Sequence, residues 1–303
     1  MKKLALIITY NCNMGCKFCI FRERINKKSE SMDLDLVKKI IKKAKNEGYS
    51  SFGLTGGEAC LNPYFYEIIE TIVKEGLKFG VVSNGYEYDK LIPLLRHKEK
   101  LEYILFSLDS AKEEIHDKLR RKGSFNNVTK AIRYFSDKGI NVKVQMCLNK
   151  WNMQEMENVA RLARKKGAKG ISYAATIPTR YNKEFILSDN EREECYKRLV
   201  LIEDKVGIKV SSSSALHIEN VTNFCQALNL THLGVQPNGD VVFCCNLMDK
   251  GIIGNILKED FTSMKKKGQK ITKILKSKRE EMLYLRVSFP GFNSCHFCNC
   301  TLD

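Results

Sequence analysis

Short apolar runs alternate along most of the chain with segments whose apolar residues recur at helical spacing. Residues 33–47 are typical of the helical segments, because Leu34, Val37 and Ile41 share one face and Gly48 ends the pattern. Six strands are predicted, at residues 4–8, 51–54, 78–82, 103–108, 142–147 and 170–174. Helices are predicted at residues 33–47, 64–75, from about 87, 126–137, 153–166 and 189–202.

This order of elements determines the expected fold class. Strands that alternate with helices pair in parallel through right-handed crossovers. Continuous apolar strands are typical of a sheet that is covered on both faces. Eight such units would close a barrel, whereas this chain supplies six. We therefore expect an α/β fold, a partial, open-sided (β/α)6 TIM-like barrel, although a flat doubly wound sheet has the same periodicity.

The pattern changes after about residue 206. Pro237-Asn238-Gly239 lies between apolar residues, and an Asn-Gly pair in that setting predicts a β-hairpin. A lysine-rich helix is expected at residues 261–278. We interpret the chain as a partial barrel followed by a smaller domain of β-hairpin plus helix: residues 1–206 and residues 207–303.

The net charge is +16, from 51 Lys and Arg against 35 Asp and Glu. Such a charge is compatible with nucleic acid, anionic surfaces or acidic peptides as partners. Solvated lysines on exposed helices explain it equally well, and no helix-turn-helix or zinc-finger spacing supports nucleic acid. The apolar run at residues 4–10 is shorter than the roughly 18 to 20 residues of a membrane span, and no signal-peptide cleavage site follows it. We expect a cytoplasmic protein without a membrane partner.

Twelve cysteines are the outstanding chemical feature. Clustered cysteines in a chain of this length without an export signal indicate metal binding or catalysis rather than disulfides. Cys12, Cys16 and Cys19 share one short loop after the first predicted strand, and ligands bind at that end of parallel strands. A structural zinc would need a fourth ligand nearby. A four-iron cluster held by three cysteines instead keeps one iron open for a ligand.

The spacing C-x3-C-x2-C of this loop resembles that of the radical S-adenosylmethionine (SAM) superfamily, and the resemblance extends from residue 4 to about 180 and on to the C-terminus. In that family the loop holds a [4Fe-4S] cluster whose open iron binds the amino and carboxylate groups of SAM. One electron then cleaves SAM to methionine and a 5′-deoxyadenosyl radical. Phe18 occupies the aromatic position that in the family packs near adenine.

Polar residues after later strands resemble further motifs of the family. Gly56-Gly57-Glu58 resembles the motif that binds the SAM amino group, although Ala59 stands where the family usually has proline. One of two arginines, Arg120 or Arg121, is expected to pair with the SAM carboxylate. The resemblance assigns nine residues to cofactor binding: Phe18, Gly56, Gly57, Glu58, Ser83, Asn84, Ser107, Asp109 and Arg120.

A second metal site is expected near the C-terminus. Cys225 is followed by thirteen residues, Gly239, four residues and Cys244, which resembles the opening of the SPASM and twitch auxiliary-cluster domains. The resemblance implies a second [4Fe-4S] cluster, hence two [4Fe-4S] clusters in all; zinc bound by four thiolates is the alternative. The expected ligands are Cys225, Cys244, Cys295 and Cys298, with Cys300 as an alternative to Cys298.

The remaining cysteines are one candidate hydrogen donor and three residues expected to serve only in packing. Cys245 points to the opposite face of its strand from Cys244 and is expected either to be buried or to return a hydrogen atom to a substrate radical, as in peptide epimerases. Cys60, Cys147 and Cys195 are expected to be small buried hydrophobic residues, with Cys60 nearest the site because it lies two residues from Glu58.

These features together predict a radical SAM enzyme that abstracts a substrate hydrogen. The expected substrate is a ribosomally made peptide, changed by epimerisation or by oxidation and cross-linking. The expected electron donor is a flavodoxin or a ferredoxin. Two alternatives remain: a small-molecule alcohol dehydrogenase that uses the auxiliary cluster as electron acceptor, and a non-enzymatic iron–sulfur or zinc protein that binds nucleic acid.

Overall fold

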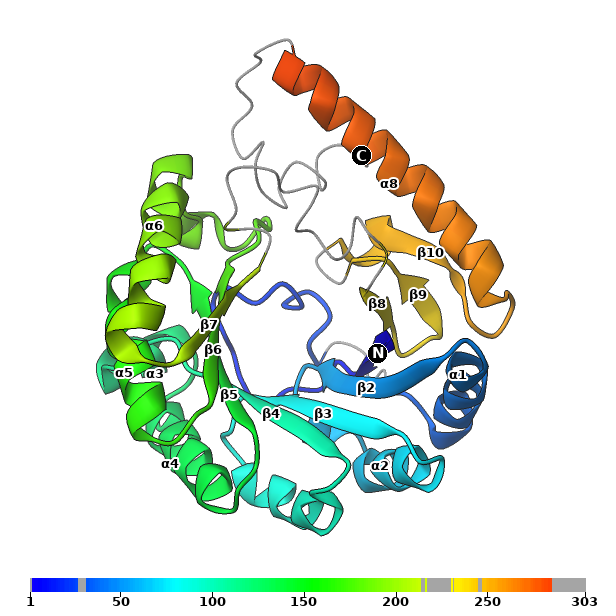
Figure 1. Cartoon of the computed structure of the whole chain (residues 1–303), viewed down its shortest axis with the longest axis horizontal. Coiled ribbons are helices and arrows are strands. Elements are labelled where there is room, and N and C mark those ends of the chain that lie inside the picture. The colour runs from blue at the N-terminus through cyan, green and yellow to red at the C-terminus, as the bar shows by residue number, and fades with distance from the viewer. Residues whose placement is uncertain are drawn as a thin grey trace.

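A computed structural model of the chain describes residues 2–26, 31–213, 216, 230, 232–244 and 247–284. Its strands are β1 (Lys2–Thr9), β2 (Tyr49–Gly56), β3 (Lys78–Ser83), β4 (Leu101–Ser107), β5 (Val142–Leu148), β6 (Gly170–Ala175), β7 (Lys209–Ser212), β8 (His232–Val235), β9 (Asp240–Val242) and β10 (Ile252–Asn255). They form one sheet in the order β10-β9-β8-β1-β2-β3-β4-β5-β6-β7. The sheet curls strongly on itself (Figure 1).

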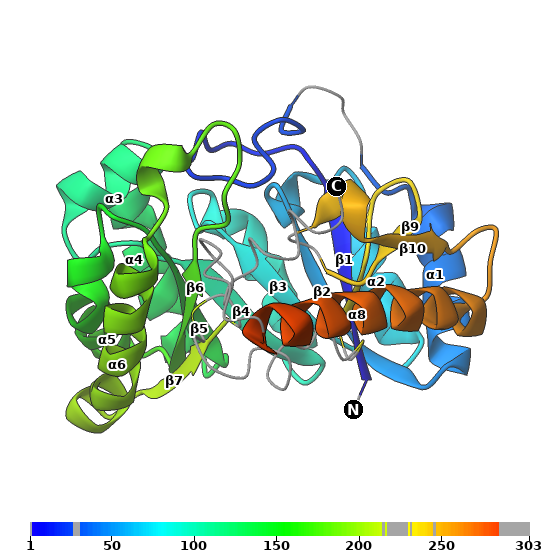
Figure 2. The same cartoon turned by 90° about the horizontal axis from the view of Figure 1, so that it is seen from above.

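Helices cover the outer face of the curled sheet, as Figure 1 shows. The α-helices are α1 (Leu34–Asn46), α2 (Phe65–Lys74), α3 (Glu113–Leu119), α4 (Ser124–Asp137), α5 (Met156–Lys165), α6 (Asp189–Val206) and α8 (Phe261–Tyr284). Short 3-10 helices are η1 (Ala59–Leu61), η2 (Tyr88–His97), η3 (Met153–Glu155), η4 (Lys183–Phe185) and η6 (Met248–Gly251). Helix α8 packs on β10, and Figure 2 shows it lengthwise on the side of the molecule that carries β9 and β10.

The expected fold class is confirmed. Each of the strands β1 to β6 pairs in parallel with the next, so the segments between them are crossover connections. Because β7 and β10 are the two edges of the sheet, the barrel formed by the described strands stays open. The flat sheet with the same periodicity does not form.

The sheet extends beyond the six predicted strands at both edges. Strand β7 pairs in parallel with β6, with Gly170 opposite Lys209. The predicted hairpin forms between β8 and β9, and β8 pairs in parallel with β1, with Lys3 opposite His232. Strand β10 and the short helix α3 were not predicted, because four and seven residues are too few for a clear period. The hairpin therefore continues the barrel sheet.

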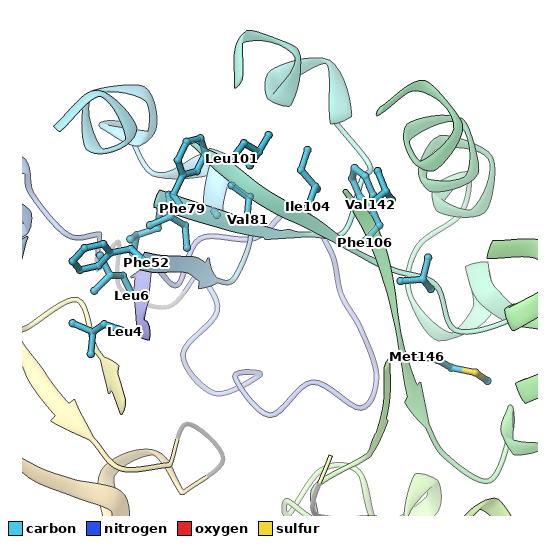
Figure 3. Close-up of a cluster of buried hydrophobic side chains, with 14 of the residues drawn as sticks. Leu4, Leu6, Phe52, Phe79, Val81, Leu101, Ile104, Phe106, Val142 and Met146 are labelled. Carbon is cyan, nitrogen blue, oxygen red and sulfur yellow. The ribbon is translucent and has the colours of Figure 1, made fainter. Parts of the chain in front are cut away.

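The core lies between the sheet and the surrounding helices (Figure 3). Alternate residues of each strand face outward into it, such as Leu4 and Leu6 of β1 and Phe79 and Val81 of β3. All four are fully buried. Since these residues occupy the outer face of the sheet, the intervening residues of each strand face the inside of the barrel, where a site can form.

Contacts from the first loop tie the hairpin to the start of the chain. The hydroxyl of Tyr10 donates to Oε1 of Gln236 at 3.0 Å, and Nη1 of Arg24 donates to the same oxygen at 2.8 Å. Arg24 also forms an ion pair with Asp249. Within the described part of the chain no helix is both long and apolar enough to cross a membrane.

Candidate active site

A cavity of about 250 Å³ lies at the carboxyl ends of the parallel strands. This is the end of such a sheet at which side chains from several strands converge. The loop that follows β1, residues 10–26, forms one wall and is called the cluster loop below. Its contributions are Cys12, Met14, Cys16, Phe18, Cys19, Ile20, Phe21 and Ile25. The strand ends contribute Thr55, Gly56, Gly57, Val82, Ser83, Asn84, Ser107, Gln145, Cys147, Ala174, Ala175, Thr176 and Ile177, and Arg120 and Ser213 complete the wall.

The three thiols of the cluster loop all line this cavity. The side chain of Asn26 forms two hydrogen bonds with the backbone of Cys12. Its Oδ1 accepts from the Cys12 amide at 3.0 Å, and its Nδ2 donates to the Cys12 carbonyl at 2.9 Å. The amide of Lys17 donates to the carbonyl of Leu119 at 3.2 Å, which holds the loop on α3. The amide of Cys19 donates to the carbonyl of Cys16 at 3.3 Å, which closes a turn between these two cysteines.

Burial makes these thiols hard to ionise without a cation. It raises the pKa of Cys12 to about 12 and the pKa of Cys19 to about 11, and it raises the pKa of Cys16 as well. At Cys16 the charge of Arg120 opposes this effect, because Nη1 of Arg120 lies 3.8 Å from Sγ. A bound metal centre would stabilise the thiolates and displace their protons.

The donor set fits a [4Fe-4S] cluster with one open iron. Three thiols converge on one cavity, and soft thiolates are the ligands of such clusters. In the parts of the chain that the structure describes, no group of three His, Cys, Asp or Glu side chains is arranged around a single metal ion. A four-iron cluster attaches each thiolate to a different iron, so its ligands need not meet at one point.

Gly56, the last residue of β2, and Gly57, the next residue, pack against the start of the cluster loop. A Cβ atom on Gly56 would collide with the carbonyl oxygen of Thr9, and one on Gly57 with that of Asn11. The amide of Gly57 donates to the Thr9 carbonyl at 2.9 Å, and the amide of Glu58 donates to the Asn11 carbonyl at 2.8 Å. The absence of a side chain at both positions therefore lets this turn pack directly on the backbone of the cluster loop and of the end of β1.

Glu58 is buried directly behind this turn, outside the residues that line the cavity. Its Oε2 accepts from the amide of Asn84 at 2.7 Å, and the thiol of Cys60 lies 3.5 Å from Oε1. Burial raises the pKa of Glu58, although these hydrogen bonds oppose the shift. No Lys, Arg or His of the described residues forms an ion pair with it. Such a carboxylate fits a cationic ligand group, for example the ammonium of SAM.

Asp109 and Arg120 form a buried ion pair behind the cavity. Nε of Arg120 donates to Oδ2 of Asp109 at 2.5 Å, and the amide of Cys147 donates to Oδ1 at 2.9 Å. Arg120 lines the cavity and its guanidinium lies 5.6 Å from the centre of the Phe18 ring, whereas Asp109 does not reach the cavity. The structure thus brings Arg120 to the site and places Asp109 behind it as its anchor.

The other assigned residues, Phe18, Ser83, Asn84 and Ser107, all line the cavity. The side chain of Asn84 donates to Oδ1 of Asn13 at 2.8 Å, which links the end of β3 to the cluster loop. Ser83 Oγ accepts from the amide of Gly85 at 3.0 Å and so shapes the same turn.

Sequence reasoning missed the lining residues beyond β4: Gln145, Cys147, Thr176 and Ser213. Of the three cysteines outside the expected metal sites, Cys60 was expected to lie nearest the site. This was wrong for the cavity, because Cys147 lines it and Cys60 does not. The alternation of side chains along β5 could have identified two of them. Gln145 and Cys147 share one face of the strand, and the neighbouring Val144, Met146 and Leu148 are buried on the other.

The second expected metal site stays a prediction. Of its ligands, Cys244 is described, partly exposed, just after β9. Gly239 has a φ of 86° in the turn before β9, which is the left-handed conformation that glycine adopts readily. The other three expected ligands, Cys225, Cys295 and Cys298, lie outside the described residues. The alternative ligand Cys300 and the candidate hydrogen donor Cys245 lie outside them as well.

Known protein families match both the first half and the C-terminal part of the chain. The profile of the radical SAM superfamily matches residues 6–163, and that of SPASM, an iron–sulfur cluster-binding domain, matches residues 225–301. The chain is 28% identical over 265 residues to the antilisterial bacteriocin subtilosin biosynthesis protein AlbA of Bacillus subtilis, covering 85% of this chain and 58% of AlbA. It is 24% identical to the mycofactocin maturase MftC of Mycolicibacterium smegmatis, covering 83% of this chain and 66% of MftC. The chain thus spans less than two thirds of each relative.

Solved structures share the fold. Streptococcus suis SuiB bound to S-adenosylmethionine superposes with a TM-score of 0.72 at 12% identity, covering 86% of this chain and 64% of SuiB. Native anSMEcpe with bound AdoMet superposes with a TM-score of 0.68 at 18% identity, covering 89% of this chain and 83% of that one. The family profile spans more than half of the chain and includes all three cysteines of the cluster loop. The chain therefore belongs to the radical SAM superfamily.

Proposed function

We propose that this chain cleaves SAM reductively and uses the product to abstract a hydrogen atom from a ribosomally made peptide. The observation that carries this proposal is the convergence of Cys12, Cys16 and Cys19 on one cavity that is flanked by a buried carboxylate and a buried guanidinium. When bound, a reduced [4Fe-4S] cluster supplies the one electron that cleaves SAM to methionine and a 5′-deoxyadenosyl radical.

Each residue of the site has a defined part in this proposal. The three thiols hold the cluster at the edge of the cavity. Glu58 accepts hydrogen bonds from the SAM ammonium, and Arg120 donates to the SAM carboxylate while Asp109 keeps its guanidinium in place. Phe18 supports the adenine, and the polar side chains at the ends of β3 and β4 bind the ribose or methionyl groups: Ser83, Asn84 and Ser107.

The peptide substrate is supported by what similar proteins are known to do. AlbA is named for the biosynthesis of a bacteriocin, MftC is a maturase, and SuiB has been solved bound to the precursor peptide SuiA. Among the described strands β7 and β10 are the edges of the sheet, so the sheet itself does not close the barrel against an extended chain. We assign SAM chemistry to residues 1–206 and a second [4Fe-4S] cluster to residues 207–303, with Cys225, Cys244, Cys295 and Cys298 as its ligands.

A pair of cysteine variants tests the first half of the proposal. Anaerobically reconstituted protein with SAM and dithionite should form 5′-deoxyadenosine, measured by liquid chromatography, and should bind about eight iron atoms if two four-iron clusters are present. Cys16→Ala should lose iron and abolish SAM cleavage. Cys195→Ala is the matched control, because this thiol is buried on α6 away from the cavity. SAM cleavage by Cys16→Ala at the rate of the unchanged chain would contradict the assignment.

The mass of the product distinguishes epimerisation of the peptide from its oxidation. The reaction is run in heavy water with precursor peptides encoded beside the gene. A gain of about one dalton at carbon means that an exchangeable donor returned the hydrogen, and Cys245 becomes the residue to mutate. A loss of about two daltons means oxidation, with the auxiliary cluster as electron acceptor. No mass change in any such peptide, with normal SAM cleavage, would overturn the peptide substrate.

A further inference from the structure

Two lysines lie close to the ring of one partly exposed tryptophan. Trp151 follows β5 and is 37% exposed. The ammonium of Lys17, from the cluster loop, lies 5.4 Å from the centre of the indole ring, and that of Lys118, from α3, lies 4.7 Å from it. We call these three residues the indole–lysine patch. Both lysines are exposed.

The patch carries positive charge that this part of the chain leaves uncompensated. Within the described ranges neither Lys17 nor Lys118 forms an ion pair with a carboxylate, whereas the neighbouring Lys112 pairs with Glu155 at 3.2 Å. Each ammonium is attracted to the π-system of the indole ring. Both stay positively charged and exposed, so an acidic surface that covers the patch would be attracted to both of them.

An aromatic wall separates the patch from the cavity while keeping it close to the cluster loop. The Trp151 ring packs on Phe185, with ring centres 4.9 Å apart, and Phe185 packs edge-on against Phe18 at 6.4 Å. Phe185 and Phe18 are 1% and 6% exposed, and Phe18 lines the cavity. Cys16 packs against the cluster that these two phenylalanines form with Leu119. The patch therefore connects to a thiol of the cluster loop through packed side chains.

This arrangement distinguishes two kinds of acidic partner. A substrate has to enter the cavity, and the buried phenylalanines close that route from the patch. An electron carrier needs only to dock close to the cluster, because the electron crosses the wall without any atom passing through it. Lys17 is exposed and directly follows Cys16 in the cluster loop, so a carrier that binds Lys17 lies close to this thiol along the chain.

We propose that the indole–lysine patch is the docking site of an acidic one-electron carrier protein, of the reduced flavin or iron–sulfur class. The proposal rests on the proposed function, since it supplies the electron which that function requires. In each encounter the carrier is oxidised by one electron and the protein-bound [4Fe-4S] cluster is reduced by one. Docking through a few charges is typical of short-lived redox encounters with small interfaces.

Charge reversal combined with two reductants tests the proposal. The double variant Lys17→Glu, Lys118→Glu is compared with Lys39→Glu, Lys42→Glu, which makes the same change in net charge on α1, also at exposed lysines. Formation of 5′-deoxyadenosine is measured with dithionite and with flavodoxin kept reduced by its reductase and NADPH. We expect the patch variant to lose about tenfold or more of the flavodoxin-driven rate at low salt, with the difference shrinking at high salt. Its dithionite-driven rate and the control variant should be unchanged.

A binding measurement that does not depend on activity accompanies the kinetics. Trp151 is the single tryptophan of the chain, so 5-fluorotryptophan labelling gives one 19F resonance located in the patch. Titrating the holoenzyme with unlabelled oxidised flavodoxin should shift or broaden this resonance at low salt. The patch variant should require a higher flavodoxin concentration for the same change. A resonance that flavodoxin leaves in place would overturn the proposal.

The remaining outcomes separate the two proposals. If dithionite drives SAM cleavage but the patch and control variants respond alike to flavodoxin, docking at the patch is refuted and the proposed function stands. If the patch variant also loses the dithionite-driven rate, the lysines act on the cluster loop and docking is refuted. If the unchanged chain cleaves no SAM with dithionite, the proposed function fails and this proposal fails with it.

Discussion

The ends of β2 and β4 each bury one carboxylate beside the cavity, and the two differ in their partners. Asp109, after β4, is fully buried and pairs with Arg120. Glu58, after β2, is 2% exposed and within the described chain has hydrogen-bond partners but no cation. A buried carboxylate with a fixed cation holds that cation in place. A buried carboxylate without a cation favours a positively charged ligand, because binding that ligand offsets the free-energy cost of having removed the carboxylate from water.

Breaking the buried pair should have the largest effect. Asp109→Asn keeps the shape of the side chain but leaves the Arg120 guanidinium buried without a counter-charge. We expect the free energy of unfolding to fall by about 3–5 kcal/mol. Asp137→Asn removes the acid of an exposed ion pair with Arg133 and should cost less than about 1 kcal/mol. Urea denaturation measures both, and equal losses would show that burial does not distinguish the two pairs.

Neutralising the unpaired acid should affect binding rather than folding. Glu58→Gln removes a buried charge, so we expect stability at neutral pH to be unchanged or slightly higher, because burial had raised the pKa of Glu58. The dissociation constant for SAM should rise about 10- to 100-fold, the usual range for a lost hydrogen bond to a charged group. Equilibrium dialysis under anaerobic conditions measures it. Glu102→Gln, at the opposite end of β4 and paired with Lys3, should leave SAM affinity unchanged.

The response to acid should differ between the two regions. Nδ1 of His116 accepts from the amide of Asp109 at 3.1 Å, and burial, helped by Arg120, lowers the pKa of His116 to about 3. The unfolded chain binds this proton below about pH 6.5, so the contribution of His116 makes the protein less stable as pH falls from 6.5 to 3, by about 1.4 kcal/mol per pH unit.

Glu58 contributes with the opposite sign. Its pKa is raised in the folded state, so its contribution to stability decreases as pH rises above the unfolded value of about 4.5. Comparing unfolding free energies of the unchanged chain with His116→Gln and Glu58→Gln between pH 4 and 7 isolates each group. At pH 7 we expect the unchanged chain to be more stable than His116→Gln and less stable than Glu58→Gln. Both differences in unfolding free energy should become smaller as the pH falls. Parallel curves for all three proteins would refute both assignments.

The smallest effect is expected at Cys147. Its backbone amide, not its thiol, donates to Asp109 at 2.9 Å, so Cys147→Ala leaves that hydrogen bond intact. We expect a stability loss of about 1 kcal/mol or less and no change in iron content. Cys12→Ala, in the cluster loop, should lose iron. Iron loss in Cys147→Ala would mean that this thiol belongs to the metal site after all.

The same comparison shows why only part of the site can be predicted from the sequence. Gly56-Gly57-Glu58 and Ser83-Asn84 are local motifs, because each turn needs particular residue types to meet the cluster loop. Gln145 and Cys147 on β5 and Ser213 just after β7 belong to no motif, since they need only face the cavity. The pairing of Asp109 with Arg120 crosses a helix and a turn, and spacing alone does not reveal which acid meets which base.

The sequence by itself determined the parallel α/β architecture and the three-cysteine loop, because strand and helix periods and ligand spacing are local properties of the chain. Tertiary structure decided that the hairpin joins the sheet beside β1 and that Cys147 lines the cavity. It also decided which carboxylate keeps a cation, and it brought Lys17 and Lys118 to one indole. These outcomes depend on how distant segments pack, and the energies that select among packings are sums over contacts between residues far apart in the chain.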